Sequence, residues 1–192
     1  MDVHLIRHGR TEANEKKLYY GKTNVPLSQQ GIANIADLKR QGIYPKDINL
    51  FFTSGLLRTE QTLTYIYGTV HREALPQLAE YHFGQFEMKS YEELKERADY
   101  QAWIADDSGQ VLCPDGESRQ QFMGRVLTGY DLLLEKSWGL KAVLLVSHGG
   151  VIASIMDALF PKVHHFYAWQ PKPGRGYTLT YALDGLCRYK QV

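Results

Sequence analysis

The sequence predicts a three-layer α/β/α sandwich with a mostly parallel sheet and an antiparallel hairpin at one edge. Short apolar segments at residues 3–6, 49–53 and 142–146 are typical of buried strands, and a segment of helical periodicity follows each of them. Near the carboxyl end, residues 177–181 alternate in polarity, and Asp184-Gly185 is a strong signal for a two-residue hairpin turn. Alternating strands and helices favour parallel pairing, and the late hairpin adds the antiparallel edge.

The first half of the chain supplies two strand–helix units. A polar loop at residues 15–26 separates the first strand from a helix whose N-cap is Ser28. The strand at 49–53 continues into a second helix, for which Ser54 has the residue type and position of an N-cap. Residues 75–78 are expected to form an edge strand or an extended segment, because they contain a proline that cannot donate a hydrogen bond to a neighbouring strand.

The middle of the chain departs from this alternation. Ser90 and Glu93 form a capping box, which predicts a helix, and we interpret residues 81–117 as an insertion that covers the carboxyl edge of the sheet. The buried face of that helix is expected to comprise Tyr91, Leu94, Ala98 and Ala102. A second capping box at Ser118 opens a helix with an apolar stripe of Phe122, Val126, Tyr130 and Leu133.

Composition indicates an ordinary globular protein. With 192 residues, of which 44% are hydrophobic and 22% charged, the chain can bury a sizeable core as one domain spanning residues 1–192. A net charge of +1 gives no reason to expect nucleic acid or a membrane surface as partner. Because the expected first strand begins almost at residue 1, we expect no signal peptide, and no apolar run reaches the ~18 residues typical of a membrane span. We therefore expect a cytoplasmic protein, and as to its assembly a monomer or homodimer.

The cysteines and histidines do not have the spacing of a metal site. Cys113 and Cys187 are isolated in the sequence, and we expect free thiols. His164-His165 is an adjacent pair, which a loop explains better than a zinc site. The sequence therefore predicts no bound metal.

Charged groups gather at the expected carboxyl ends of the strands. Arg7-His8-Gly9 follows the first strand, Ser147-His148-Gly149 follows the strand at 142–146, and Arg58 lies just after the strand at 49–53. In open α/β sheets this edge is where ligands bind. Two arginines and two histidines at one edge would suit a doubly charged anion such as a phosphate monoester, because guanidinium groups match phosphate oxygens.

With Thr11, Asn14 and Glu80 added, these motifs resemble the histidine phosphatase superfamily, whose members include phosphoglycerate mutases. The likeness extends over nearly the whole chain, and several motifs in the same order are far more specific than an Arg-His-Gly triplet alone. It implies a phosphoglycerate mutase-like fold, a phosphohistidine intermediate and no cofactor. It also implies a small phosphorylated metabolite as the binding partner.

The resemblance assigns the reacting groups. His8 would be the nucleophile, with its second ring nitrogen held as N–H by a backbone carbonyl, that of Gly9. Glu80 would protonate the leaving oxygen and, once ionised, activate the incoming water. Glu87 is the rival carboxylate, but its place in the loop favours a structural role.

The resemblance also assigns the phosphate and substrate contacts. Arg7, Arg58 and His148 would surround the phosphoryl oxygens. The alternative for Arg58 is a surface arginine paired with Glu60 or Glu12. The further residues expected at the substrate are Asn14, Tyr20, Gly21, Gly149 and His82. For Tyr20 a surface role without substrate contact, and for His82 no role, remain equal alternatives.

Within the superfamily, the compact chain and Arg10, where the mutases usually carry glutamate, favour a phosphatase over a phosphoglycerate mutase. Residues 78–88, 100–103 and 116–117 are most similar to the α-ribazole phosphatases, which remove the 5′-phosphate during assembly of the cobalamin nucleotide loop. A broad-specificity sugar-phosphate phosphatase, a mutase and a non-catalytic phosphate-binding module are the alternatives. Serine hydrolysis is disfavoured, because the Gly-x-Ser-x-Gly elbow is absent from the sequence.

Overall fold

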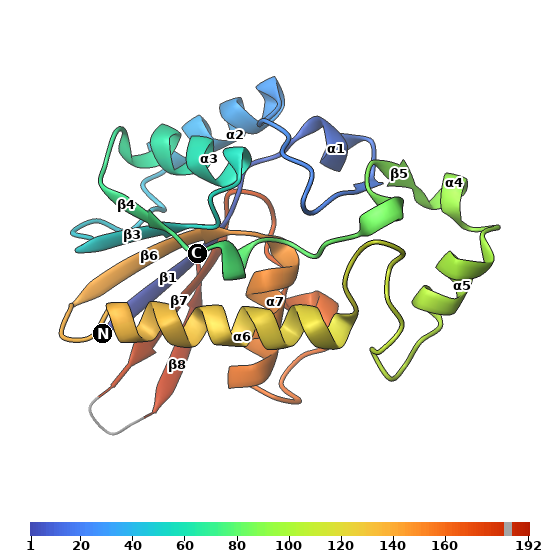
Figure 1. Ribbon diagram of the computed structural model, residues 1–192. Coiled ribbons are helices and arrows are strands. Elements are labelled where there is room, and N and C mark those ends of the chain that lie inside the picture. Colours follow the sequence, from blue (N-terminus) through green and yellow to red (C-terminus); the bar gives the residue numbers. More distant parts are fainter. Residues whose placement is uncertain (183–185) are drawn as a thin grey trace.

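A six-stranded sheet in the order β4-β3-β6-β1-β7-β8 runs through the protein in this computed structural model, which describes residues 1–182 and 186–192 (Figure 1). The parallel part consists of β4 (Arg72–Ala74), β3 (Leu50–Thr53), β6 (Ala142–Ser147) and β1 (Asp2–Arg7). The antiparallel edge consists of β7 (Gly176–Tyr181) and β8 (Cys187–Gln191). The predicted fold class is thereby confirmed, while the expected turn at Asp184-Gly185 lies outside the described residues.

Helices cover both faces of the sheet (Figure 1). One face carries α2 (Gln29–Arg40) and α3 (Leu57–Tyr67), and the other carries α6 (Arg119–Lys136) and α7 (Gly149–Leu159). Strand β6 serves both layers, because Val143 and Leu145 belong to the core under α6 and α7, whereas Leu144 and Val146 belong to the core under α2 and α3. Burial on both faces explains why residues 142–146 form an uninterrupted apolar segment in the sequence.

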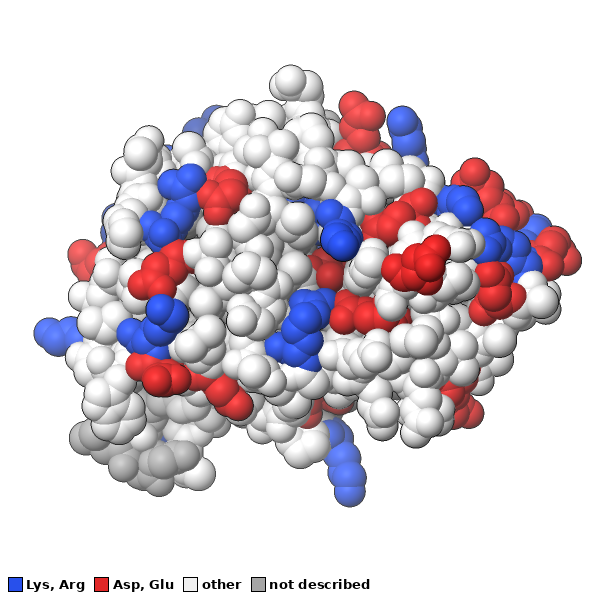
Figure 2. Space-filling model, in the orientation of Figure 1, with Lys and Arg blue, Asp and Glu red and all other residues white. Residues whose placement is uncertain are grey.

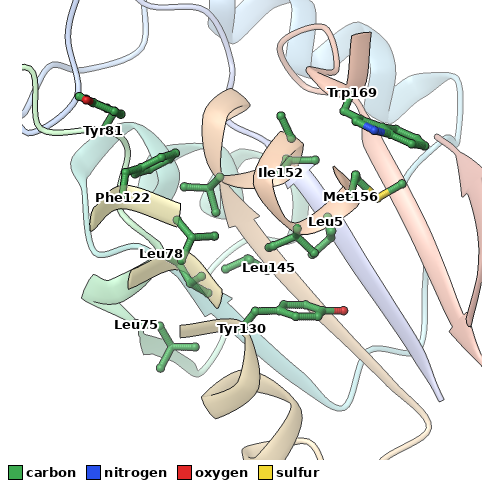
Figure 3. Packing of buried hydrophobic residues seen from close by; sticks show 14 of the residues in the cluster. Leu5, Leu75, Leu78, Tyr81, Phe122, Tyr130, Leu145, Ile152, Met156 and Trp169 are labelled. Carbon is green, nitrogen blue, oxygen red and sulfur yellow. The ribbon is translucent and has the colours of Figure 1, made fainter. Parts of the chain in front are cut away.

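The larger core lies between the sheet and α6 and α7. The predicted stripe of α6, namely Phe122, Val126, Tyr130 and Leu133, is buried there. Figure 3 shows Phe122 and Tyr130 gathered with Leu78 and with Leu5 and Leu145 of the sheet. The predicted capping box opens this helix, since Ser118 Oγ accepts a hydrogen bond from the Gln121 N–H at 3.2 Å and Gln121 accepts one from the Ser118 N–H.

Two predicted element boundaries are wrong. Ser54 does not cap α3: the N-cap is Leu56, and the Ser54 hydroxyl instead lies 2.8 Å from Nε2 of His148, which follows the neighbouring strand β6. Residues 75–78 are not an edge strand: β4 occupies the edge, and the 3₁₀ helix η1 (Pro76–Leu78) follows it. Proline opens this helix, at a position where its missing N–H is not needed.

The region after β1 contains more structure than the predicted polar loop. The short helix α1 (Glu12–Glu15) precedes β2 (Leu18–Tyr19), which pairs with β5 (Lys89–Ser90) in a small separate sheet. Two-residue strands leave no periodic signal in a sequence. This pairing ties the segment after β1 to the start of the segment 81–117.

The helix predicted after Ser90 is broken into α4 (Tyr91–Leu94) and α5 (Ala98–Ile104). Its expected face is largely wrong, since Tyr91, Ala98 and Ala102 are exposed and only Leu94 is buried. Tyr100 is buried instead, because the break between α4 and α5 changes the helical phase. Together with the 3₁₀ helix η2 (Gly84–Phe86), these helices lie beyond the end of the sheet in Figure 1.

The described surface agrees with the composition. Figure 2 shows basic and acidic side chains intermixed over the visible face, without a continuous area of one sign. Among the described residues, no helix is both long and apolar enough to cross a membrane. Cys113 and Cys187 are free thiols, as predicted.

Candidate active site

His8 and His148 meet at the carboxyl edge of the sheet. They follow the adjacent parallel strands β1 and β6, and the His8 N–H donates to the carbonyl of Ser147 at 2.9 Å. The two ring centroids lie 5.2 Å apart at an interplanar angle of 63°. Both side chains are buried, at 2% and 0% exposure, so the strand ends place two imidazoles side by side away from bulk water.

The backbone orients the His8 ring. Nδ1 of His8 lies 2.6 Å from the carbonyl oxygen of Gly9, as predicted, and because a carbonyl can only accept, Nδ1 carries the proton. Nε2 then holds the free lone pair. Burial, followed by the positive charges of Arg58 and Arg7, lowers the pKa of His8 well below its ordinary value of 6.5. The neutral, nucleophilic form of the imidazole is therefore favoured at neutral pH.

Arg58 is fully buried beside these rings. Its Nη2 donates to the carbonyl of Gly21 at 2.7 Å and its Nη1 to that of Thr23 at 3.0 Å. The guanidinium carbon lies 4.9 Å from the centroid of the Tyr20 ring, within reach of a cation–π interaction. The alternative of a surface arginine paired with Glu60 or Glu12 is wrong, because loop carbonyls and not carboxylates hold this side chain.

Three buried side-chain nitrogens around His8 have no hydrogen-bond partner among the described residues: Arg7 Nε, Arg58 Nε and His148 Nδ1. The rest of the Arg7 head is held by a bond from Nη1 to the carbonyl of Pro171 at 2.9 Å. Buried polar groups are nearly always paired, so three unpaired ones at one place need an explanation. An anionic ligand between them would supply it, since the oxygens of a phosphoryl group could accept from both guanidinium nitrogens and from a protonated Nδ1 of His148.

Glu80 faces the same space from the segment after η1. Its Oε2 accepts from the N–H of Gly150 and its Oε1 from the N–H of Tyr81, both at 3.0 Å. A Cβ on Gly150 would lie 2.5 Å from Oε1 of Glu80, and one on Gly149 would lie 3.0 Å from Cζ of Arg7. The two glycines after His148 thus leave room for the charged side chains that approach α7.

Asn14, Tyr20 and Gly21 surround this centre in different ways. Oδ1 of Asn14 accepts from the Tyr20 hydroxyl at 2.8 Å, so the amide nitrogen is the group left to donate. The side chains of Asn14 and Tyr20 both line the cavity above His8. Gly21 acts through its carbonyl on Arg58, and a Cβ there would lie 1.6 Å from the carbonyl oxygen of Tyr81.

Glu87 has the structural role that the sequence favoured. Its carboxylate accepts hydrogen bonds from the backbone N–H groups of Gly21, Lys22, Thr23 and Phe83. The loop that supplies the carbonyl partners of Arg58 is therefore fixed by Glu87, and this carboxylate does not line the cavity above His8.

Comparison with known protein families identifies the superfamily of the chain. The family model described as histidine phosphatase superfamily (branch 1) matches residues 3–186. The chain belongs to the histidine phosphatase superfamily. Two proteins similar to this chain carry the name adenosylcobalamin/α-ribazole phosphatase. The adenosylcobalamin/α-ribazole phosphatase of Salmonella typhimurium is 31% identical over 163 residues, which are 83% of this chain and 79% of that protein.

Solved structures from the superfamily superpose over the whole chain. The crystal structure of the α-ribazole phosphatase from Shigella flexneri has a TM-score of 0.86 at 25% identity, with 100% of this chain and 96% of that chain covered. The phosphoglycerate mutase from Thermus thermophilus has a TM-score of 0.70 at 27% identity, with 100% and 98% covered. The phosphoglycerate mutase-like fold is confirmed, and both phosphatase and mutase names occur among these histidine phosphatase relatives.

The cavity extends well beyond the histidines and has a volume of about 620 Å³. His8, Arg7 and Glu80 form part of its lining, together with an aromatic wall and the charged side chains of Asp107, Arg119 and Asp157. The wall is made by Tyr19, Phe83 and Trp103, whose ring centroids lie 5.3 to 6.1 Å apart.

His82 does not line this cavity. Its side chain borders a second, smaller hollow of about 260 Å³, to which Glu80 and Arg125 also contribute. Among the described residues, His, Cys, Asp and Glu side chains do not assemble into a group of three or more that could hold a metal ion.

The sequence did not predict two residues of the site. The first is Ser54, whose Oγ lies 2.8 Å from Nε2 of His148. Its position directly after a strand of the parallel part of the sheet is a signal that could have indicated it. Arg125 donates to the carbonyls of Gln77, Ala79 and Glu80 from the middle of α6. No local pattern marks this arginine, because its acceptors lie 45 to 48 residues earlier.

Proposed function

We propose that this protein is a phosphomonoester hydrolase that acts through a phosphohistidine on His8, and that its substrate is α-ribazole 5′-phosphate. The observation that supports the phosphohistidine mechanism is the set of three buried, unpartnered donors on Arg7, Arg58 and His148 around the neutral imidazole of His8. Such preorganised donors stabilise the charge of a transferring phosphoryl group most effectively where water is excluded.

In the first step, Nε2 of His8 attacks phosphorus and the ester P–O bond breaks. Glu80 gives its proton to the departing alkoxide, so the alcohol leaves neutral and Glu80 becomes ionised. In the second step, Glu80 takes a proton from water as the water oxygen attacks phosphorus and the N–P bond breaks. His8 and protonated Glu80 are regenerated, and inorganic phosphate leaves.

The size and aromatic wall of the cavity support a substrate larger than a simple sugar phosphate. A volume of about 620 Å³ lies within the range of about 300–1,000 Å³ typical of small-molecule sites. Tyr19, Phe83 and Trp103 offer ring faces and edges to a flat base such as benzimidazole. Phe166 and Tyr167, from the 3₁₀ helix η3 (Phe166–Trp169), supply further aromatic lining.

The charges of the outer cavity favour an uncharged alcohol as the leaving group. Asp107 and Asp157 line the cavity, and neither carboxylate has an ion-pair or hydrogen-bond partner within residues 1–182 and 186–192. Arg119 offsets one of the two negative charges. A substrate with a second phosphate or a carboxylate, as in phosphoglycerates, would meet net repulsion, whereas ribose hydroxyls could donate to these carboxylates.

Covalent trapping tests the proposed reaction. Enzyme quenched during turnover of ³²P-labelled α-ribazole 5′-phosphate is expected to carry acid-labile, alkali-stable label at His8, and His8→Ala should carry none. His4→Gln is the matched control, because His4 is a buried strand histidine whose Nδ1 contacts the Thr178 hydroxyl at 2.8 Å, away from the cavity. Wild-type turnover by His8→Ala would overturn the mechanism. If other phosphomonoesters label His8 but α-ribazole 5′-phosphate does not, the proposed substrate is wrong while the mechanism stands.

A further inference from the structure

The guanidinium group of Arg125 uses every one of its donors within one small region. Its Nη1 donates to the carbonyls of Gln77 at 2.7 Å and Ala79 at 2.9 Å, and its Nη2 donates to the carbonyl of Glu80 at 3.3 Å. The two remaining N–H groups bind Glu117, Nε to Oε2 at 3.2 Å and Nη2 to Oε1. Five N–H groups therefore meet five acceptors, three of which are carbonyls of the segment that carries Glu80.

That segment has little regular structure to hold it. Between η1 and η2, residues 79–83 are neither helix nor strand, so their backbone groups need partners from elsewhere. Glu117 completes what Arg125 begins: its Oε1 accepts from the His82 N–H at 2.8 Å, and its own N–H donates to the His82 carbonyl at 3.0 Å. The backbone is thus fixed on both sides of Glu80 by one ion pair.

We propose that Arg125 is a positioning residue for proton transfer, because it holds the backbone of Glu80 at the distance from His8 that protonation of the leaving oxygen requires. This inference rests on the proposed role of Glu80 as proton donor. Every N–H group of Arg125 is already bonded to a protein acceptor, so none is left to bind substrate directly. Small displacements of a catalytic group are costly, since a misplacement of about 1 Å can reduce a rate about 10²-fold.

Lysine cannot replace this arginine. An ammonium group has three donors and no planar fork, so it cannot serve three carbonyls and a carboxylate at once. Arg125→Lys should therefore retain the charge opposite Glu117 but recover only part of the activity lost in Arg125→Met. Comparison of these two variants separates the effect of the positive charge on activity from the effect of the hydrogen-bond geometry.

The leaving-group dependence of kcat provides the test. An alkyl phosphate such as ribose 5-phosphate needs a proton on its leaving oxygen, whereas p-nitrophenyl phosphate does not. We expect Arg125→Met to lower kcat for ribose 5-phosphate by about 10²-fold and kcat for p-nitrophenyl phosphate far less, with similar KM values. The control is Lys136→Met, which removes another cation of α6 that pairs with Glu73, away from residues 77–82.

The double variant separates positioning from general stability. If Arg125 acts through Glu80, then Arg125→Met should add almost no loss on ribose 5-phosphate in a Glu80→Gln background. Equal losses of Arg125→Met on both substrates, or full additivity with Glu80→Gln, would overturn the proposal. Should Arg125→Met fail to fold, Arg125→Lys and Glu117→Gln are measured with the same two substrates, and the same criteria apply.

Failure of this inference differs from failure of the proposed function. If Glu80→Gln shows no leaving-group selectivity while His8 is still labelled, the proton-donor role of Glu80 is wrong and the positioning role falls with it. If His8 is never labelled, the hydrolase mechanism itself is wrong. If both hold and Arg125→Met shows no selectivity, only the role of Arg125 is wrong.

Discussion

Nε2 of His148 lies 2.8 Å from the hydroxyl oxygen of Ser54, so a side-chain hydrogen bond joins the ends of the neighbouring strands β6 and β3. This contact fixes the rotation of a fully buried imidazole whose other nitrogen, Nδ1, has no partner among the described residues. A proton on Nδ1 requires Nε2 to accept from the Ser54 hydroxyl. In the proposed phosphoryl complex, the Ser54 hydroxyl would donate to Nε2 and so support the tautomer of His148 that carries its proton on Nδ1.

Replacement of Ser54 should weaken phosphate recognition without abolishing it. Ser54→Ala leaves Nε2 of His148 buried and unpaired, and a lost partner of a buried group costs about 1–3 kcal/mol. We expect kcat/KM for p-nitrophenyl phosphate to fall about tenfold, with a matching loss of affinity for vanadate. Thr64→Ala, an exposed threonine of α3, is the control. Unchanged vanadate affinity in Ser54→Ala would contradict the proposed role.

Stability should depend on pH through the buried histidines. Burial is the largest cause that lowers the pKa of both His8 and His148 well below 6.5, with Arg58 as the next cause for each. Below pH 6.5 the unfolded chain takes up protons that the folded chain resists, so the stability present above that pH is lost as the pH falls toward the folded pKa values. We therefore expect Tm to fall between about pH 7 and pH 5.

The slope of Tm against pH distinguishes these histidines from others. His148→Gln removes one of the two groups, so the slope should become shallower even if the variant is less stable overall. His71→Gln changes an exposed histidine outside the site and should keep the wild-type slope. A steeper or unchanged slope in His148→Gln would show that another group governs the acid sensitivity.

Local patterns explain which parts of the fold could be predicted. Strands buried on both faces and capping boxes such as that at Ser118 leave their signal within a few residues, and these predictions are confirmed. The small sheet of β2 and β5 could not be predicted, because it is a long-range pairing of two short segments. The break between α4 and α5 was missed for a related reason: the ring of Tyr100 packs against Tyr19, which is distant in sequence.

The candidate site likewise contains residues that local sequence patterns predict and contacts that they do not. His8, Arg58 and His148 could be placed together because each follows a strand in the parallel part of the sheet. The sequence could not show that loop carbonyls hold Arg58 or that Arg125 holds the Glu80 segment, since backbone acceptors are present at every residue. Such contacts depend on the tertiary fold alone.

Activity is expected to be independent of divalent metal ions. In the proposed mechanism, the charges of Arg7 and Arg58 and the hydrogen bonds of Arg7, Arg58 and His148 would neutralise the phosphoryl group, a task that a magnesium ion performs in other phosphoryl-transfer enzymes. Turnover should therefore persist in EDTA, and vanadate should inhibit as a trigonal-bipyramidal mimic of the transferring group. Arg7→Met should lower the affinity for vanadate, whereas Arg40→Met, an exposed arginine of α2 paired with Asp37, should not. Loss of turnover in EDTA that a divalent ion restores would exclude this view.

Wild-type protein should prefer α-ribazole 5′-phosphate at least tenfold in kcat/KM over 3-phosphoglycerate, fructose bisphosphates and small nucleotides. Asp157, on the cavity side of α7, lies among the residues that would face the leaving group. Its charge should contribute to that preference, because two like charges about 4 Å apart repel by about 1 kcal/mol in water and more where water is excluded.

Substitution of this carboxylate tests the origin of the preference. Asp157→Asn is expected to raise kcat/KM for 3-phosphoglycerate about fivefold and to leave that for p-nitrophenyl phosphate unchanged, since the latter carries no second anionic group. Asp131→Asn, an exposed residue of α6 outside the cavity, controls for the change in net charge. An equal gain in both variants would attribute the effect to overall charge. Comparable wild-type turnover of all four substrates would instead identify a broad-specificity phosphomonoesterase.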